Sequence, residues 1–161
     1  MGKVHLGVGP KYPQVVVLIG ATGDLSQRKL LPGLFHLISA GFIPGCRIIG
    51  VSLDAIDADV FREIARGALE RSPGRKASEE EWAAFAEILD YVPIGAGPQA
   101  LREAVLKAEA CFEGQSERLH YLSVPPSAAL SSVRLLADAG LVDHSRVIME
   151  KPFGTDLASA E

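Results

Sequence analysis

The apolar run from Val15 to Ile19, ended by Gly20, is the feature that most constrains the fold of this chain. A continuous run rich in β-branched residues is typical of a strand buried on both faces of a parallel sheet. After Gly20, large apolar residues recur at helical spacing as far as Gly41, where glycine is a natural helix stop. Pro32 stands inside that pattern and predicts a kink or a broken first turn, because proline removes a backbone donor.

The alternation of strand and helix patterns continues to the end of the chain. Further buried strands are expected at 47–51, 119–124 and 146–149, and a weaker one at 91–94, which Pro93 assigns to a sheet edge or a strand end. Helices are expected at 59–70, from a Ser78–Glu81 capping box through Trp82 to Leu89, at 98–112 and at 130–139. Parallel strands require crossover helices, so this order predicts an α/β fold with a Rossmann-like, doubly wound, mostly parallel sheet.

The size and composition of the chain favour one domain. It has 161 residues, of which 48% are hydrophobic and 22% charged, values that allow a single ordinary core. We expect residues 1–14, which contain several glycines and prolines, to be a flexible N-terminal tail. Residues 15–161 are then the folded domain.

Charge and cysteine usage exclude several classes of protein. The formal net charge of −4, without a dense basic run, argues against nucleic acid or an anionic membrane as a partner. No apolar run approaches the roughly 20 residues that span a bilayer, and the start of the chain does not have the pattern of a signal segment. Two cysteines, Cys46 and Cys111, cannot build a disulfide framework or a four-thiolate zinc site. We therefore expect a soluble cytoplasmic protein without a metal site.

The segment 20–26, Gly-Ala-Thr-Gly-Asp-Leu-Ser, lies where the first strand is expected to turn into the first helix. Doubly wound folds bind the pyrophosphate of a dinucleotide at this turn, on the free amides of the helix start. Gly20 would permit the tight turn, Gly23 would let the backbone approach phosphate, and the small Ser26 would let helix and sheet pack together. The domain is accordingly predicted to bind a dinucleotide, and an ordinary glycine-rich turn without a ligand is the alternative.

Asp24 narrows the choice of nucleotide-binding motif. A Walker phosphate loop needs Lys and then Ser or Thr directly after its second glycine, whereas Gly23 is followed by Asp24, so a kinase or nucleotide hydrolase is disfavoured. The Asp24 carboxylate could cap the helix by accepting hydrogen bonds from backbone amides, or it could contact the ligand. Both roles remain open from the sequence.

Three motifs carry a resemblance to a known family. The chain reads GATGDLSQRKLL at 20–31, RLHYLSVPP at 118–126 and EKPFG at 150–154. In this order and at this approximate separation, the motifs resemble the coenzyme-binding part of glucose-6-phosphate dehydrogenases, and the likeness extends from about Val15 to the last residue. The resemblance implies that the large C-terminal α+β substrate domain of these enzymes is absent from this chain.

The same resemblance implies roles for individual residues. The backbone of the glycine turn would hold the coenzyme pyrophosphate, Tyr121 and the proline pair at 125–126 would lie along the coenzyme, and Lys151 would contact both substrate and coenzyme. Lys151 is thus the implied binder of glucose 6-phosphate. The candidate cofactor-binding residues are Gly20, Ala21, Thr22, Gly23, Asp24, Leu25, Ser26, Ser52, Tyr121 and Lys151.

The reaction implied by the resemblance is the first step of the pentose phosphate pathway, the oxidation of glucose 6-phosphate to 6-phosphogluconolactone with hydride transfer to the coenzyme. A histidine base oriented by an aspartate would remove the hydroxyl proton. The Arg-Ile-Asp-His-Tyr-Leu-Gly-Lys type of block that carries this histidine does not occur here, so no catalytic residue is predicted and the chain alone is expected to be inactive. The four histidines, expected to be structural or solvated, are His5, His36, His120 and His144.

The end of the second strand bears on the choice between NADP and NAD. Many members of the family place an Arg there to grip the 2′-phosphate of NADP, but this chain has Leu53 at that position, followed by Asp54. A carboxylate suits the ribose hydroxyls of NAD and repels a 2′-phosphate, although Asp54 could instead begin the next helical connection. Ser52 could still bond a phosphate. NADP is expected from the habit of the family, with NAD as the alternative.

Two other functions are weighed against a dehydrogenase part. The missing histidine block favours, as an alternative, a non-catalytic coenzyme-binding remnant that partners with a full-length relative. A short-chain reductase would need a Tyr-x-x-x-Lys pair, but the residues four positions after Tyr12, Tyr91 and Tyr121 are Val, Gly and Pro. Because the missing domain would leave an apolar sheet edge exposed, self-association into a homo-oligomer is also expected.

Overall fold

The computed structural model describes residues 12–149 except 42, 44 and 75. Its centre is a five-stranded sheet with the strand order β3-β2-β1-β4-β5, and all four pairings are parallel. The strands are β1 (Gln14–Ile19), β2 (Cys46–Ser52), β3 (Leu89–Pro93), β4 (Glu117–Leu122) and β5 (Ser145–Met149). The α/β, doubly wound prediction is therefore confirmed. Lys151, Glu150 and the EKPFG motif lie outside the described residues, as does most of the expected N-terminal tail.

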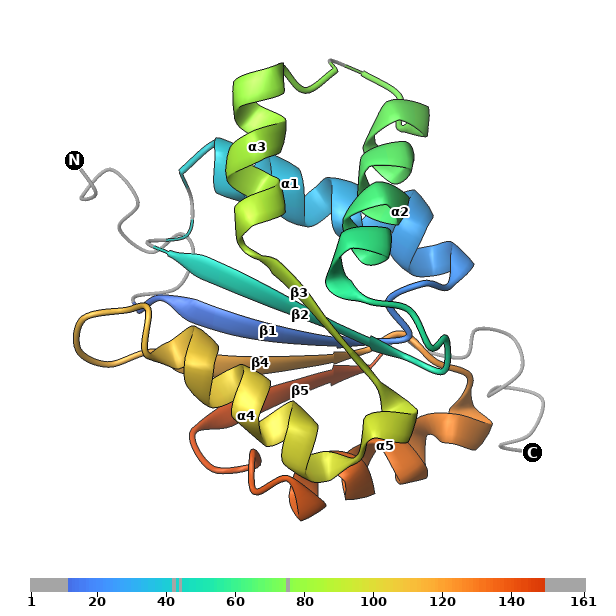
Figure 1. The fold of residues 1–161 in the computed structure, drawn as a ribbon, viewed down its shortest axis with the longest axis vertical. Coiled ribbons are helices and arrows are strands. Elements are labelled where there is room, and N and C mark those ends of the chain that lie inside the picture. The colour runs from blue at the N-terminus through green and yellow to red at the C-terminus, as the bar shows by residue number, and fades with distance from the viewer. Residues whose placement is uncertain (1–11, 42, 44, 75, 150–161) are drawn as a thin grey trace, which may run out of the picture.

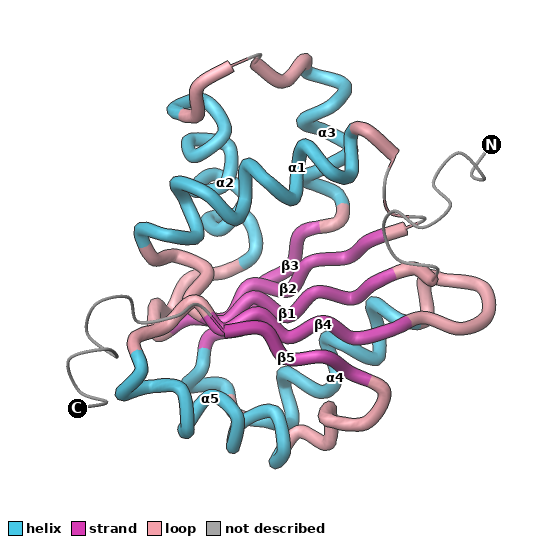
Figure 2. Tube along the Cα trace, turned by 180° about the vertical axis from the view of Figure 1, so that it is seen from behind, coloured by secondary structure: helices cyan, strands magenta, loops and turns pink. Residues whose placement is uncertain are grey.

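Helices cover both faces of the sheet (Figure 1, Figure 2). One face carries α1 (Leu31–Ser39), α2 (Ala58–Arg71) and α3 (Glu79–Glu87), and the other carries α4 (Pro98–Glu109) and α5 (Pro126–Asp138). Alternate residues of β1 divide between two apolar clusters, because successive side chains of a strand point to opposite faces. Val16 and Leu18 pack toward α1 to α3, whereas Val15, Val17 and Ile19 pack toward α4 and α5.

The expected elements are present, with shifts at their ends. Pro93 ends the edge strand β3, in agreement with the prediction. Leu89, expected at the end of a helix, is instead the first residue of β3, where it is buried and pairs with Ile48. The last helix starts at Pro126 instead of Leu130, because proline is well suited to the first turn, where no backbone donor is needed.

Pro32 disturbs the first helix in a specific way. The segment Ser26–Leu30 is a π-helix, in which the backbone N–H of Leu31 donates to the carbonyl of Ser26. Pro32 cannot donate to the carbonyl of Arg28, and its ring crowds that carbonyl, so the preceding turn widens. The predicted local break is thus a widened turn inside a helix that continues to Ser39.

His120 is a polar residue of β4 that lies in the core beside the loop after α5. Its side chain is fully buried, and its Nε2 lies 2.8 Å from the carbonyl oxygen of Leu141, so Nε2 carries the proton and donates. Nδ1 has no hydrogen-bond partner among the described atoms. Burial lowers the pKa of His120, and the Arg118 charge adds to this, while the hydrogen bond to Leu141 acts in the opposite direction.

No helix within the described ranges is both long and apolar enough to cross a bilayer.

The lowered pKa of His120 predicts a pH-dependent stability. Below about pH 6.5, His120 binds a proton in the unfolded chain, whereas the buried His120 of the folded chain is still neutral. The free energy of unfolding therefore falls as the pH falls. One proton accounts for at most about 1.4 kcal/mol per pH unit. His120→Gln keeps a donor for Leu141 and should flatten the dependence between pH 7.5 and 5.5, measured by urea unfolding. The exposed control His36→Gln should retain the wild-type slope.

The apolar edge strand β5 predicts self-association of this chain. Among the described residues, β5 has a neighbouring strand on one side only, and the exposed fractions of Val147, Ile148 and Met149 are 47%, 39% and 50%. Open apolar edges pair readily with other chains. Sedimentation velocity should show a concentration-dependent oligomer that Ile148→Lys weakens and the loop substitution Val142→Lys does not. A monomer at all concentrations would contradict the expectation.

Candidate functional site

The strands β1 and β4 lie side by side at the centre of the sheet, and the chain leaves them toward opposite faces. After β1 it enters the helix that leads into α1, and after β4 it enters α5, which covers the other face (Figure 2). In open α/β sheets this divergence opens a crevice at the carboxyl ends of the two strands, where ligands bind. The predicted glycine turn lies at this point.

Gly20 closes the turn against the end of β4. Its φ is +90°, and a Cβ at this position would lie 2.0 Å from the carbonyl oxygen of Ser123. Only glycine fits a backbone that has this conformation and this neighbour. The amides of Gly20 and Ala21 both donate to the carbonyl of Val51, at 2.8 and 3.2 Å, so the turn is attached to β2 as well.

The helix after this turn starts without a side-chain cap. The amide of Gln27 donates to the carbonyl of Gly23 at 3.1 Å, which makes Gly23 the residue where the helix begins. The amides of Asp24, Leu25 and Ser26 precede this first intrahelical bond and have no carbonyl partner within the helix. Gly23 is exposed and has no side chain to cover them, so this end can receive an anion.

Ala21, Leu25 and Ser26 form the inner side of the turn. Ala21 and Ser26 are fully buried and Leu25 is half-buried. A small residue at position 26 lets the helix start approach the sheet, in the manner that the sequence indicated. The Ser26 hydroxyl oxygen has no hydrogen-bond partner in the described part of the chain, which leaves a polar group inside the candidate phosphate site.

Asp24 is exposed on the outer side of the turn. Its Oδ2 accepts a hydrogen bond from Arg28 Nε at 2.7 Å, an ion pair between residues one helical turn apart. The sequence left open a capping role and a ligand role for this carboxylate. The described partner of the Asp24 carboxylate is thus the Arg28 side chain and not a backbone amide of the helix start.

A second group of polar side chains connects the turn to the end of β2. Thr22 Oγ1 lies 2.7 Å from Ser52 Oγ and donates to Asp54 Oδ2 at 2.5 Å. Asp54 lies at the start of the connection from β2 to α2, and the residue that caps α2 is Asp57, which accepts from Val60 N at 2.9 Å.

Tyr91 closes the far side of this group from β3. Its hydroxyl donates to the backbone carbonyl of Asp54 at 2.6 Å. Burial raises the pKa of Tyr91, and the Asp54 carboxylate raises it further, against a smaller opposite effect of Ser52. Tyr91 is therefore a neutral phenol at physiological pH, and its hydroxyl donates to the carbonyl of Asp54 in the loop after β2.

Tyr121 and Lys151 complete the set of residues suggested by the resemblance. Tyr121 is half-buried on β4, pairs with Leu18 of β1, and packs against the apolar cluster under α1. It lies one residue before the end of β4, close to the crevice. Lys151 is not among the described residues, so its implied contacts with substrate and coenzyme stay predictions.

Two contacts of the site could not be anticipated from the chain order. Gln27 Nε2 donates to the carbonyl of Thr22 at 2.8 Å and its Oε1 accepts from Arg71 at 2.7 Å, so this side chain clamps the turn. The Thr22–Asp54 bond joins residues 32 positions apart. The only sequence signal for the second contact is the parallel pairing of the first two strands, which brings both strand ends to one edge.

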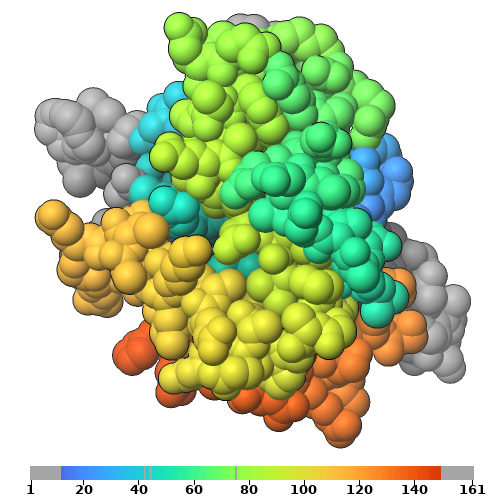
Figure 3. All heavy atoms as spheres, viewed as in Figure 1, coloured from blue at the N-terminus to red at the C-terminus, as the bar shows by residue number. Residues whose placement is uncertain are grey.

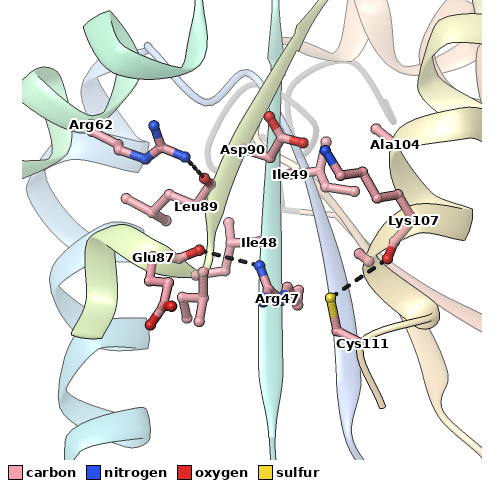
Figure 4. A pocket seen from close by; sticks show the side chains of 12 residues that line it. Arg47, Ile48, Ile49, Arg62, Glu87, Leu89, Asp90, Ala104, Lys107 and Cys111 are labelled. Carbon is pink, nitrogen blue, oxygen red and sulfur yellow. Dashed lines mark hydrogen bonds between the residues drawn. The ribbon is translucent and has the colours of Figure 1, made fainter. Parts of the chain in front are cut away.

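A hollow of about 140 Å³ lies elsewhere, beside β2 and β3, and is lined by residues from these strands, the end of α3 and α4 (Figure 3, Figure 4). Arg47 Nη1 donates to the carbonyl of Glu87 at 3.2 Å, and Arg62 donates to those of Ala86 and Leu89, both at 2.9 Å. The last turn of α3 contains no basic residue, so these arginines supply the positive charge that a helix C-terminus favours. Arg47 and Arg62 thus serve the fold.

No cluster of His, Cys, Asp and Glu side chains able to hold a metal ion occurs in the part of the chain that the structure describes. Burial raises the pKa of Cys46 to about 12, which keeps this thiol protonated.

The parallel, doubly wound sheet and the uncapped helix start at its centre define the chain as a domain of the dinucleotide-binding class. The family model described as "Glucose-6-phosphate dehydrogenase, NAD binding domain" matches residues 17–161. The chain therefore belongs to the glucose-6-phosphate dehydrogenase family and corresponds to its coenzyme-binding domain.

Relatives of known identity agree with this assignment. Glucose-6-phosphate 1-dehydrogenase of Dickeya dadantii is 36% identical over 148 residues, which are 90% of this chain and 30% of the relative. The cytoplasmic isoform of Solanum tuberosum is 33% identical over 160 residues, 91% of this chain and 31% of the relative.

Solved structures show the same fold. A glucose-6-phosphate dehydrogenase in complex with its substrate glucose 6-phosphate matches with a TM-score of 0.77 and 29% identity, over 94% of this chain and 33% of that one. The enzyme of Mycobacterium avium matches with a TM-score of 0.74 and 31% identity, over 91% and 32%. The chain thus spans about a third of the length of these relatives.

The contact between Gly20 and Ser123 predicts a strong effect of one added methyl group. Gly20→Ala forces a residue with a side chain into φ +90° and toward a backbone oxygen that cannot move freely, so we expect a loss of at least about 2 kcal/mol in the free energy of unfolding. Urea unfolding measures this loss. The matched control Gly33→Ala, in α1 with nothing within 4 Å, should be neutral or stabilising.

Proposed function

We propose that this chain is the coenzyme-binding part of a glucose-6-phosphate 1-dehydrogenase and that it binds a nicotinamide dinucleotide across the crevice between β1 and β4. The observation that carries the proposal is the exposed, side-chain-free helix start at Gly23, which offers three amides to the coenzyme pyrophosphate. Gly20, Ala21, Leu25 and the small Ser26 would shape this cradle. Membership of the family supports the same ligand class.

The proposed activity of the complete protein is the oxidation of glucose 6-phosphate to 6-phosphogluconolactone. A bound, oxidised nicotinamide would supply the acceptor for the hydride of the sugar C1, and a base would take the proton of the C1 hydroxyl. Within this chain, Tyr121 would lie along the coenzyme and Lys151 would contact the sugar phosphate, as their places in the matching motifs suggest. Family resemblance favours NADP as the coenzyme and leaves NAD as the alternative.

We further propose that the protein is cytoplasmic and that the complete enzyme takes glucose 6-phosphate as its substrate. Neither nucleic acid nor a membrane is proposed as a partner, because the net charge is −4 and the chain has no dense basic run. The open edge of β5 supports a homo-oligomer.

Calorimetric titration of the 161-residue chain with NADP and with NAD tests coenzyme binding. We expect at least one of them to bind, and we expect Gly23→Trp to weaken binding about tenfold or more, about 1.4 kcal/mol, by covering the free amides. Gly33→Trp is the matched control, since it adds the same side chain to an open position of α1. Equal binding by wild type and Gly23→Trp would contradict the proposed site.

A coupled measurement tests whether this chain can turn over glucose 6-phosphate without the family's histidine block. The chain alone should show no reduction of coenzyme by glucose 6-phosphate, because the family's histidine block does not occur in its sequence. Turnover by the isolated chain would refute this expectation.

A further inference from the structure

The polar group at the ends of β1 and β2 has a defined hydrogen-bond direction. Thr22 has one hydroxyl proton and donates it to Asp54 Oδ2 at 2.5 Å. In the 2.7 Å contact between Thr22 and Ser52, the donor must therefore be Ser52. The two hydrogen bonds run in one direction, from Ser52 to Thr22 and from Thr22 to Asp54. Neither hydroxyl proton is left to donate to an anion.

The charge of Asp54 is not neutralised by a described cation. No lysine or arginine of the described ranges forms an ion pair with it, and the two arginines attached to the turn are engaged, Arg28 with Asp24 and Arg71 with Gln27. Leu53, next to Asp54, exposes 83% of its surface and brings no charge. The Asp54 carboxylate also adds to the rise in the pKa of Tyr91.

The position of this carboxylate determines what it meets. In doubly wound folds, the end of the second strand faces the ribose of the coenzyme's adenosine half, when the pyrophosphate sits on the first turn. A carboxylate there accepts hydrogen bonds from two ribose hydroxyls, whereas a 2′-phosphate would bring close to two further negative charges beside it. Because Ser52 and Thr22 both donate inward, neither of these hydroxyls compensates that repulsion.

We propose that Asp54, held in place by Thr22 and Ser52, makes this domain select NAD over NADP. This inference rests on the proposed binding of a nicotinamide dinucleotide and runs against the coenzyme that family resemblance favours. Asp54 contacts the ribose, and Thr22 and Ser52 act as positioning residues that fix the carboxylate. Their hydroxyl protons are donated within this group and are not available to a 2′-phosphate.

Equilibrium binding of NAD and NADP to the chain, measured by calorimetry at low salt, tests the selection. The wild type should bind NAD at least about tenfold more tightly than NADP, a difference of about 1.4 kcal/mol. Asp54→Asn, which still accepts from Thr22, should strengthen NADP binding and shrink the ratio severalfold. Adding Leu53→Arg to Asp54→Asn should reverse the preference, since a guanidinium can pair with the 2′-phosphate.

The control is Asp138→Asn, which removes the same charge from an exposed position at the end of α5 and should leave the ratio unchanged. Raising the salt concentration should narrow the wild-type preference, because screening weakens the repulsion of an exposed carboxylate. Wild-type binding of NADP as tight as, or tighter than, that of NAD would overturn the inference and leave the proposed function intact. Failure of both coenzymes to bind would overturn the proposed function and this inference together.

Discussion

The close approach of Gly20 to the carbonyl of Ser123 is the contact on which the arrangement of the site depends. It lets the turn after β1 pass over the end of β4 without a gap, while two hydrogen bonds to Val51 attach the same turn to β2. Three strand ends are thereby tied to one short segment. The helix start that follows is aimed at the crevice because its first residue, Gly23, follows directly from this anchored backbone.

The sequence predicts those parts of the structure that depend on local pattern. Buried strands are short and rich in β-branched residues, so β1, β2 and the edge strand with Pro93 can be recognised from a few consecutive residues. Pro32 similarly predicts a disturbed turn, although the pattern does not show that the helix widens and continues. The end of α3 is harder, because Leu89 suits a helix and a buried strand equally well, and its pairing with Ile48 decides the outcome.

The candidate site could be located from the sequence but not assembled. The glycine turn follows a strand, so its place at the sheet edge is predictable. The bond between Thr22 and Asp54 depends on how β1 and β2 align in space, which no local pattern contains. The same limit applies to His120, whose partner Leu141 lies 21 positions away and becomes a neighbour only when α5 packs on the sheet.

The direction of the hydrogen-bond chain at the end of β2 also bears on how coenzyme preference can change during evolution. Loss of the acceptor oxygen at position 54 releases the Thr22 proton, and the release of Thr22 then frees Ser52 to turn its own proton outward. One substitution would thus convert a surface that only accepts hydrogen bonds into one with two donors. A lineage could therefore cross from one dinucleotide to the other by a single step at the strand end, and a later arginine would consolidate the change.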